Sequence, residues 1–318
     1  MAKLNGVIGF EFNSYEIRAV EMQKASGGYS LVAFGKQPLE SGVVEEGFIR
    51  DPEKFSDAFL TLMREKNFAA ENITLGVNNE NVVMRYASFP KVPDDKLRNM
   101  IFLQAQEFMP IPVQEMEMDY IICGETVNAE EQEMIDVVLV GARKNMLDQF
   151  INVFDAAKKT ILDVEPTAFA LCRTASMVNP DKCYCLLNVS NGIINFLFVK
   201  GETMQTVRSI SIPEKHFDAV QNVYKGEATE DDVNEAAGML VSELNASISY
   251  YGVQHPMDPV DVVYFMADVE NAQQIKDIIQ ESVSLPVEIP SFYANMGGSA
   301  DISAYTGCIS MAIEALEG

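Results

Sequence analysis

Two short polar turns, each enclosed by apolar strands, are the segments best suited to bind an anion. The first is Asn13-Ser14-Tyr15, which follows VIGFEF. The second is Ser190-Asn191-Gly192, inside a strand pair predicted over 184–199. Small residues in such turns let backbone N–H groups approach phosphate oxygens closely. Because the turns occupy equivalent places in two similar segments, FEFNSYEIRAVEM and LNVSNGIINFLFV, the pattern fits a cleft that clamps a nucleotide.

The cysteines and histidines indicate neither a metal site nor a catalytic triad. The five cysteines are scattered, and strand alternation predicts Cys183 and Cys185 on one face. No further ligands stand at a spacing typical of zinc. The two histidines, His216 and His255, have no nearby serine or cysteine in a nucleophile motif. We therefore expect buried, reduced thiols and no metal centre.

The charge balance excludes several classes of partner. The chain has 318 residues, with 47 acidic against 23 basic side chains and a net charge of -24. Binding to nucleic acid or to an anionic membrane surface needs clustered cations. A basic or amphipathic protein partner suits the composition, because an acidic surface attracts cations. The sequence has no apolar run of about 18 residues and no secretory signal, so we expect a cytoplasmic protein that does not insert directly into a membrane.

Alternating strand and helix patterns predict a mixed α/β chain. Asp51 and Pro52 form a favourable helix start, followed by apolar residues at helical spacing. Asp94 is expected to cap a second helix, which ends before Pro110. The charged segment 225–232 is predicted to be a solvated loop. Further strands are predicted over 29–35, 73–78, 81–88, 117–123, 135–142, 161–164, 203–212 and 261–266, and further helices over 144–158, 233–250, 270–282 and 302–316.

The helix predicted from Asp94 carries an apolar stripe with two interpretations. Leu97, Met100 and Ile101 lie along one side of it together with Gln104. These residues could line a groove for a partner peptide, since methionine suits adaptable peptide-binding surfaces. Packing of the helix on its own sheet explains the same spacing, and we favour that interpretation.

Several segments in a fixed order resemble the PilM family, the actin-like proteins of type IV pilus assembly. They read IGFEFNSYEIRAVE, SGVVEEGFIRDPEKFSDAF, FPKVPDDKLRNMIFLQAQEFMPIPVQEMEMDY and VVLVGARKNMLDQFINVFDAAKKTILDVEPTAFALCR. The resemblance covers nearly the whole chain. It implies an actin-like (ribonuclease H-like) α/β fold of two lobes, with a small inserted α/β domain of the type found in PilM and in the division protein FtsA.

The resemblance also implies domain limits. Residues 1–37, 144–180 and 300–318 would form the first actin-like lobe. Residues 38–143 would form the inserted domain, and 181–299 a reduced second lobe.

By the same resemblance, the two turns correspond to the nucleotide loops of actin-like ATPases. Glu11, Asn13, Ser14 and Arg18 fall at positions of the first loop. Asn13 replaces the glycine of the family pattern, and the two residues after Ser14 place bulk and negative charge near a phosphate. A carboxylate about 4 Å from a phosphate charge costs roughly 1 kcal/mol in water. Arg18 is either a phosphate ligand or an outward-facing strand residue, and we favour the second.

In the second loop, the corresponding residues are Asn188, Ser190, Asn191 and Gly192. Asn188 stands where the family pattern has aspartate, and an amide neither neutralises Mg²⁺ nor accepts a proton well. A third signature, Gly-Gly after a strand, is replaced by residues 266–268 (Met-Ala-Asp). Together these departures predict a degenerate site with no cofactor; weak binding of ATP and Mg²⁺ is the disfavoured alternative.

The resemblance implies a scaffold rather than an enzyme. The chain would bind the cytoplasmic tail of an inner-membrane pilus protein of the PilN type, in a groove near the inserted domain, at the inner face of the cytoplasmic membrane. It would link that tail indirectly to the pilus motor ATPase. Two alternatives stay open: an active ATPase of the same fold, and a type II secretion relative. The latter carries its own membrane anchor, whereas this sequence ends at Gly318 without one.

Overall fold

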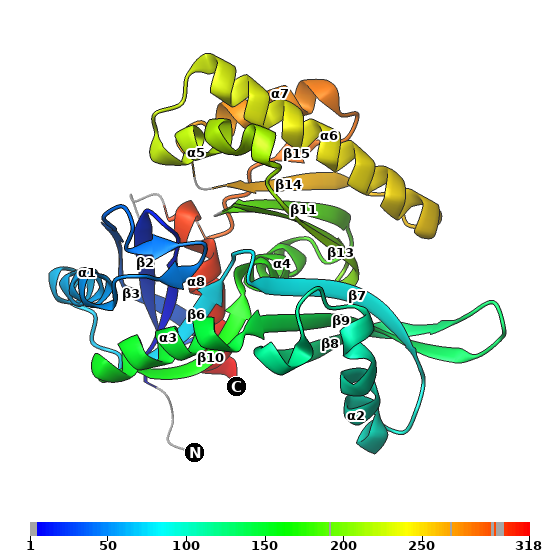
Figure 1. Ribbon diagram of the computed structural model, residues 1–318, viewed down its shortest axis with the longest axis horizontal. Helices are drawn as coiled ribbons and strands as arrows, with labels where there is room; N and C mark the ends of the chain where they lie inside the picture. The colour runs from blue at the N-terminus through cyan, green and yellow to red at the C-terminus, as the bar shows by residue number, and fades with distance from the viewer. Residues whose placement is uncertain (1–4, 191, 268, 294–295, 297–301) are drawn as a thin grey trace.

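A computed structural model describes residues 5–190, 192–267, 269–293, 296 and 302–318 (Figure 1). It has two lobes, each built on a five-stranded sheet, and a small unit built on a three-stranded sheet. In Figure 1 the first lobe lies at the left, the second lobe at the top and the small unit at the lower right.

The sheet of the first lobe has the strand order β10-β6-β1-β2-β3. An antiparallel meander supplies three strands; of the two strands that follow crossovers, β6 pairs in parallel with β1 and β10 pairs in parallel with β6. These strands are β1 (Val7–Phe12), β2 (Glu16–Ala25), β3 (Gly28–Pro38), β6 (Asn72–Val77) and β10 (Thr160–Pro166). The helices that pack on them are α1 (Pro52–Glu65), α3 (Lys144–Ala156) and α8 (Thr306–Glu317).

Aromatic side chains hold α1 and α3 against one face of this sheet. The ring of Phe10 on β1 lies 5.5 Å from Phe59 on α1 and 5.2 Å from Phe154 on α3, both edge to face. The predicted start of α1 is confirmed, because the Asp51 side chain accepts a hydrogen bond from Lys54 N at 3.1 Å. The strand that leads into the first turn therefore lies on a well-packed core.

The opposite face of the sheet is covered by α8 at very short range. A Cβ atom added at Gly9 would lie 1.8 Å from the backbone oxygen of Cys308. Only glycine permits this approach, since any larger residue would displace the helix backbone. The contact brings the N-terminal end of α8 to the edge of the cleft between the lobes.

The sheet of the second lobe has the order β13-β12-β11-β14-β15. Its apolar core includes Cys183 and Cys185, which share one face as predicted. The strands are β11 (Cys183–Ser190), β12 (Ile193–Lys200), β13 (Thr203–Ser211), β14 (Val262–Ala267) and β15 (Val287–Glu288). The helices are α5 (Phe217–Lys225), α6 (Glu230–Gln254) and α7 (Ala272–Ser282).

The charged segment 225–232 is a solvated loop only at residues 226–229, and helices occupy both of its ends. Helix α5, which we did not predict, ends at Gly226 in the left-handed conformation, and α6 begins at Glu230. Thr229 and Asp232 form a capping box, in which each side chain accepts a hydrogen bond from the backbone N–H of the other. The acidic run is thus the first turn of a helix, where negative charge is favourable.

The small unit is a sheet of order β7-β9-β8 with one helix, α2. We expected the inserted domain to start at residue 38, but β6 pairs in parallel with β1 and α1 packs in the core of the first lobe. The separate sheet therefore begins only at β7. Its elements are β7 (Val82–Pro90), α2 (Asp94–Gln104), β8 (Met116–Val127) and β9 (Glu133–Arg143).

Helix α2 packs on the small sheet. Leu97 and Ile101 are buried in the core of the unit, Met100 is half-buried and Gln104 is exposed. The four residues do not form one surface, and Leu97 and Ile101 cannot contact a partner while α2 stays packed. Asp94 does not cap the helix as predicted: Pro93 occupies the cap position without a side-chain hydrogen bond, and Asp94 is the first helical residue.

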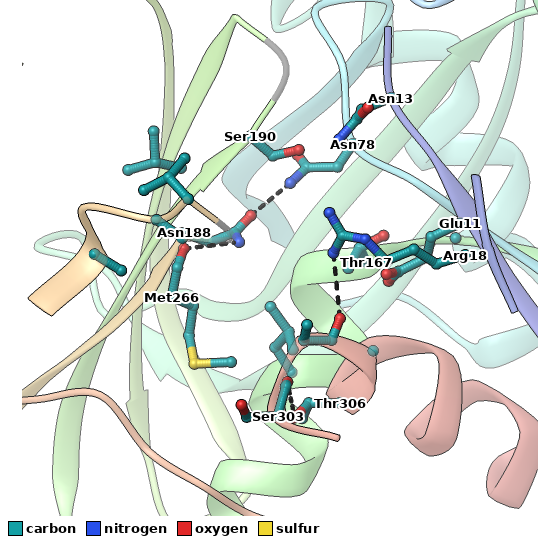
Figure 2. A pocket seen from close by; sticks show the side chains of 18 of the residues that line it. Glu11, Asn13, Arg18, Asn78, Thr167, Asn188, Ser190, Met266, Ser303 and Thr306 are labelled. Carbon is teal, nitrogen blue, oxygen red and sulfur yellow. Dashed lines mark hydrogen bonds between the residues drawn. The ribbon is translucent and has the colours of Figure 1, made fainter. Parts of the chain in front are cut away.

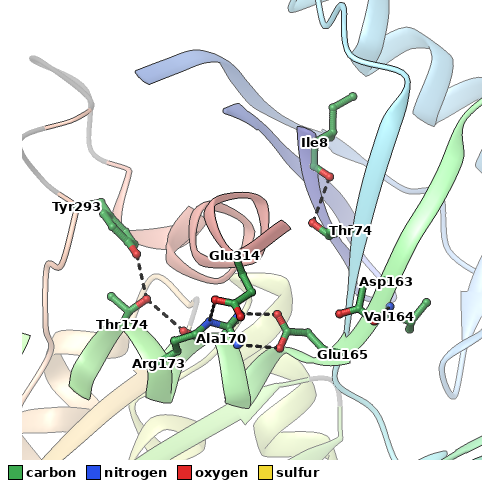
Figure 3. A network of polar contacts seen from close by, with 10 residues as sticks. All are labelled: Ile8, Thr74, Asp163, Val164, Glu165, Ala170, Arg173, Thr174, Tyr293 and Glu314. Carbon is green, nitrogen blue, oxygen red and sulfur yellow. Dashed lines mark hydrogen bonds and ion pairs between the residues drawn. The ribbon is translucent and has the colours of Figure 1, made fainter. Parts of the chain in front are cut away.

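Helix α4 (Thr167–Val178) lies between the lobes and is held by ionic and polar contacts (Figure 3). Arg173 binds the Glu165 carboxylate with two hydrogen bonds of 3.1 and 2.6 Å and pairs with Glu314 of α8 at 3.3 Å. Thr174 bonds to the Tyr293 hydroxyl at 3.1 Å. Strand β10, α4 and α8 are thereby fixed relative to one another at the base of the cleft.

Two kinds of feature do not occur among the described residues. None of their helices is both long and apolar enough to cross a bilayer. Nor do their histidines, cysteines and carboxylates form a group of three that could hold a metal ion.

Candidate functional site

A cavity of about 320 Å³ lies between the two lobes (Figure 2). The ends of β1 and β6 and the start of α8 line one side, and β11, β14 and α5 line the other. Five of the predicted site residues meet in this cleft: Glu11, Asn13, Arg18, Asn188 and Ser190. The remaining walls include apolar side chains of the second lobe, among them Met266, Val269 and Ile289.

The first turn is closed by its own asparagine. Asn13 Oδ1 accepts hydrogen bonds from the backbone N–H groups of Tyr15, at 2.8 Å, and Glu16, at 2.9 Å. Backbone N–H groups of this kind are the donors that bind a phosphate in an anion-binding turn. In this chain both have an acceptor within the turn itself.

Arg18 lies inside the cleft and does not face outward as we expected. Its side chain is only 11% exposed, and its guanidinium contacts Glu16 at 2.5 Å and the Ala304 carbonyl at 3.2 Å. Lys36 also pairs with Glu16, at 3.0 Å. Burial alone would raise the pKa of Glu16, but the two cations outweigh it and lower that pKa below its ordinary value.

The ion pairs of Glu16 predict a pH-dependent loss of stability in a Glu16→Gln variant. A carboxyl whose pKa is lowered in the fold stabilises the folded state above its unfolded pKa, and this stabilisation disappears as pH falls through the folded pKa. We expect the variant to lose about 1 kcal/mol at neutral pH and almost nothing near pH 3. Urea unfolding of both proteins at each pH measures the difference. An equal deficit at both pH values would contradict the ionic explanation.

Glu11 is packed against the first turn of α8. A Cβ atom added at Gly307 would lie 2.1 Å from Glu11 Oε1, and one added at Gly76 would lie 3.0 Å from Glu11 Cγ. Thr167 borders the same space, since its Oγ1 lies 2.7 Å from the added atom at Gly76. Oε1 is buried from solvent. The carboxylate therefore lies against the helix and Thr167.

A series of amide hydrogen bonds crosses the cleft between the lobes. Asn78, which follows β6, donates to Asn188 Oδ1 at 2.5 Å and accepts from Asn195 Nδ2 at 2.8 Å. Asn188 Nδ2 donates to the Met266 carbonyl at 3.3 Å, and Ser209 Oγ donates to Asn195 Oδ1 at 2.6 Å. Figure 2 shows the part formed by Asn78, Asn188 and Met266. We call these five residues the asparagine ladder.

Asn78 and Asn195 are not among the site residues that the sequence predicts. The only signal near Asn78 was the polar segment Asn78-Asn79-Glu80 between two predicted strands. Asn195 is one polar residue within an apolar strand, and such a residue needs a buried partner. That need indicates a polar contact, but the partner itself cannot be read from the strand.

The other predicted residues of the two turns do not line this cleft. Ser14 and Gly192 border a second crevice of about 590 Å³, together with α5 and the loop around Glu45. The Tyr15 hydroxyl crosses that crevice and donates to Gln221 of α5. Asn191 lies outside the described residues, as does Asp268 of the third signature.

Comparison with known proteins decides the family. The model of the family described as type IV pilus assembly protein PilM matches residues 9–204. The chain belongs to the PilM family. The matched range contains the first turn, the small unit, α4 and the second turn. The cleft residues that precede β13 in the chain therefore lie within the family match.

Solved structures show the fold of this PilM-family chain. A chain of a PilM–PilN type IV pilus biogenesis complex superposes with a TM-score of 0.79 at 16% identity, covering 98% of this chain and 99% of the other. EutJ, an ethanolamine utilization protein of Carboxydothermus hydrogenoformans, gives 0.54 at 8% identity, covering 97% and 89%. A Bacteroides thetaiotaomicron protein described as having an actin-like ATPase fold gives 0.48 at 7%, covering 96% and 97%. The family match and the first two superpositions confirm the predicted α/β actin-like fold.

Proposed function

We propose that this PilM-family protein is a cytoplasmic scaffold of type IV pilus assembly. It binds the cytoplasmic tail of a PilN-type inner-membrane protein at the inner face of the membrane and thereby connects that protein indirectly to the motor ATPase. The observation that carries the proposal is family membership, joined to a superposition over 98% of the chain on a protein from a PilM–PilN complex. A net charge of -24 supports a basic tail as the partner.

The proposal includes a cleft that does not hydrolyse ATP. Three observations support this part. Asn13 accepts from two N–H groups of the first turn, and Asn188 uses both ends of its amide within the asparagine ladder. The Glu11 carboxylate is packed against α8. A triphosphate with Mg²⁺ needs free N–H donors and an accessible carboxylate, so these residues do not fit that group.

Tail binding is tested by calorimetry with a synthetic cytoplasmic tail of a PilN-type protein encoded in the same pilus locus. We expect binding that weakens by about tenfold between about 50 mM and about 300 mM salt, because opposite charges attract less when screened. The matched control is the same peptide with its lysines and arginines replaced by glutamate, which should not bind. Absence of binding by the native tail at low salt would overturn the proposal.

The state of the cleft is tested separately by thermal unfolding with Mg-ATP. A ligand present at 100 times its dissociation constant stabilises a protein by about 2.7 kcal/mol, which raises Tm by several degrees. We expect a shift below about 1 °C at millimolar Mg-ATP. A shift of several degrees would contradict the inactive cleft and would favour the active ATPase, without bearing on tail binding.

A further inference from the structure

The asparagine ladder joins two bodies that have separate apolar cores. Asn78 belongs to the first lobe, whereas Asn188, Asn195, Ser209 and Met266 belong to the second. We infer that the ladder is a latch: it holds the two lobes closed without a bound ligand, and the lobes separate only when both hydrogen bonds of Asn78 break. The latch acts whether or not the protein binds a PilN tail.

The Met266 carbonyl, at one end of the ladder, determines which atom donates and which accepts in the amide hydrogen bonds that follow. The Met266 carbonyl can only accept, so Asn188 must turn Nδ2 toward it and Oδ1 toward Asn78. Asn78 must then present Nδ2 to Asn188 and Oδ1 to Asn195. A single orientation of each amide satisfies all four bonds. The closed arrangement is therefore specified, and flipping the amide of Asn188 or of Asn78 would oppose like atoms at both of its ends.

Burial makes the ladder sensitive to the loss of a member. Asn195 is 1% exposed and Asn188 is 6% exposed. Neighbouring hydrogen bonds in a buried chain polarise one another, and a buried amide without a partner is strongly unfavourable. If Asn78 loses its amide, Asn188 and Asn195 each lose a partner. Opening of the cleft lets water replace those bonds.

The position of Asn78 is fixed by its chain neighbours. Asn79 Oδ1 accepts from Asn81 N at 2.9 Å, and Asn81 Nδ2 donates to the Glu46 carbonyl at 2.5 Å. Asn79 and Asn81 are buried, and Asn79 fills the space beside Gly47. The segment between β6 and β7 is thus bound to the hairpin of β4 (Val44–Glu45) and β5 (Phe48–Ile49). Asn78 is held in place from the first lobe and cannot follow the second lobe when it moves.

The remaining contacts between the parts indicate which side opens. On one side, the two hydrogen bonds of Asn78 cross between the lobes, and the Tyr15 hydroxyl crosses the second crevice to Gln221. On the other side, an apolar cluster joins the small unit and α4 to the sheet of the second lobe, with Met84 and Val138 packed near Tyr184 and Leu197. Large apolar contacts resist separation more than polar ones do. Rotation about this cluster would separate the lobes at the ladder.

The distance between the lobes tests the latch directly. Spin labels on Glu53→Cys in α1 and Glu281→Cys in α7 report that distance in the full chain. Both sites are exposed, whereas the five native cysteines are buried and should not react. We expect one narrow distance distribution without any ligand, unchanged by Mg-ATP. In the Asn78→Ala background we expect a longer mean distance or a second, longer population.

Two further variants control the experiment. Asn195→Ala removes one of the two hydrogen bonds of Asn78 and should shift the distribution in the same direction but by less, which keeps the test valid if Asn78→Ala fails to fold. Asn99→Ala, at an exposed asparagine of α2, should leave the distribution unaltered. Two results would overturn the inference. One is a broad distance distribution in the labelled protein with an intact ladder, and the other is the same distribution in that protein and in folded Asn78→Ala and Asn195→Ala variants.

Discussion

Replacing Gly9 by alanine is expected to destabilise the protein more than any other single-methyl change in the first lobe. The added Cβ would lie 1.8 Å from the carbonyl oxygen of Cys308, 2.6 Å from its carbonyl carbon and 2.9 Å from its Cα. All three are backbone atoms of α8, so no side chain can rotate to make room. The helix would have to leave the sheet, and we expect a loss of more than about 3 kcal/mol in the free energy of unfolding.

The matched control for this change is Gly124→Ala. Gly124 also lies in a strand, but a Cβ atom there would meet nothing within 4 Å. Its variant should stay within about 0.5 kcal/mol of the unmodified protein. Urea unfolding of the three proteins gives the comparison. Similar midpoints for the Gly9 and Gly124 variants would show that the backbone of α8 does not pack directly against Gly9.

Asn188→Asp should convert the ladder into a pH-sensitive contact. At neutral pH the carboxylate would still accept from Asn78, but it would face the Met266 carbonyl with a second acceptor. We expect a loss of about 1–3 kcal/mol. A protonated carboxyl can donate to that carbonyl, so the fold raises the pKa of the new group. Its penalty is therefore absent below the unfolded pKa of about 3.9 and grows as pH rises through the folded pKa.

Unfolding of Asn188→Asp between pH 3.5 and pH 7 measures this trend. The exposed variant Asn99→Asp carries the same new charge without a buried contact and should show no comparable pH dependence. If the Asn188 variant were as stable as the unmodified protein at pH 7, Asn188 would not donate to the Met266 carbonyl. The resemblance to the nucleotide loops of actin-like ATPases implies aspartate at this position, so the variant also measures what the amide contributes to this chain.

Local patterns predicted most elements of the fold. The start of α1 followed from Asp51 and Pro52, because a cap acts within three residues of itself. The two turns followed from small polar residues between apolar strands. The start of α6 was missed because its capping box lies within an acidic run that also fits a loop. The limit of the small unit was missed because β6 pairs with a strand about sixty residues earlier in the chain.

The candidate site could be predicted in part. Family resemblance located Glu11, Asn13 and Asn188 at the cleft, and the structure brings them together there. The orientation of Arg18 was not predictable from strand alternation alone. Its buried guanidinium is stabilised by the Glu16 carboxylate and by the Ala304 carbonyl, and the second of these partners is far away in the sequence. Leu97 and Ile101 had two interpretations because helical spacing is the same for a core stripe and for a groove.

By itself, the sequence determined the acidic character of this PilM-family chain, the order of its strands and turns, and the presence of Asn13 and Asn188 at the ends of apolar strands. Those properties depend on composition and on neighbours within a few residues. Only the tertiary structure decided that Asn78 bonds to Asn188 and Asn195, which lie 110 and 117 positions away. Such partners depend on how the sheets of the two lobes pack against each other, and local sequence patterns do not determine that packing.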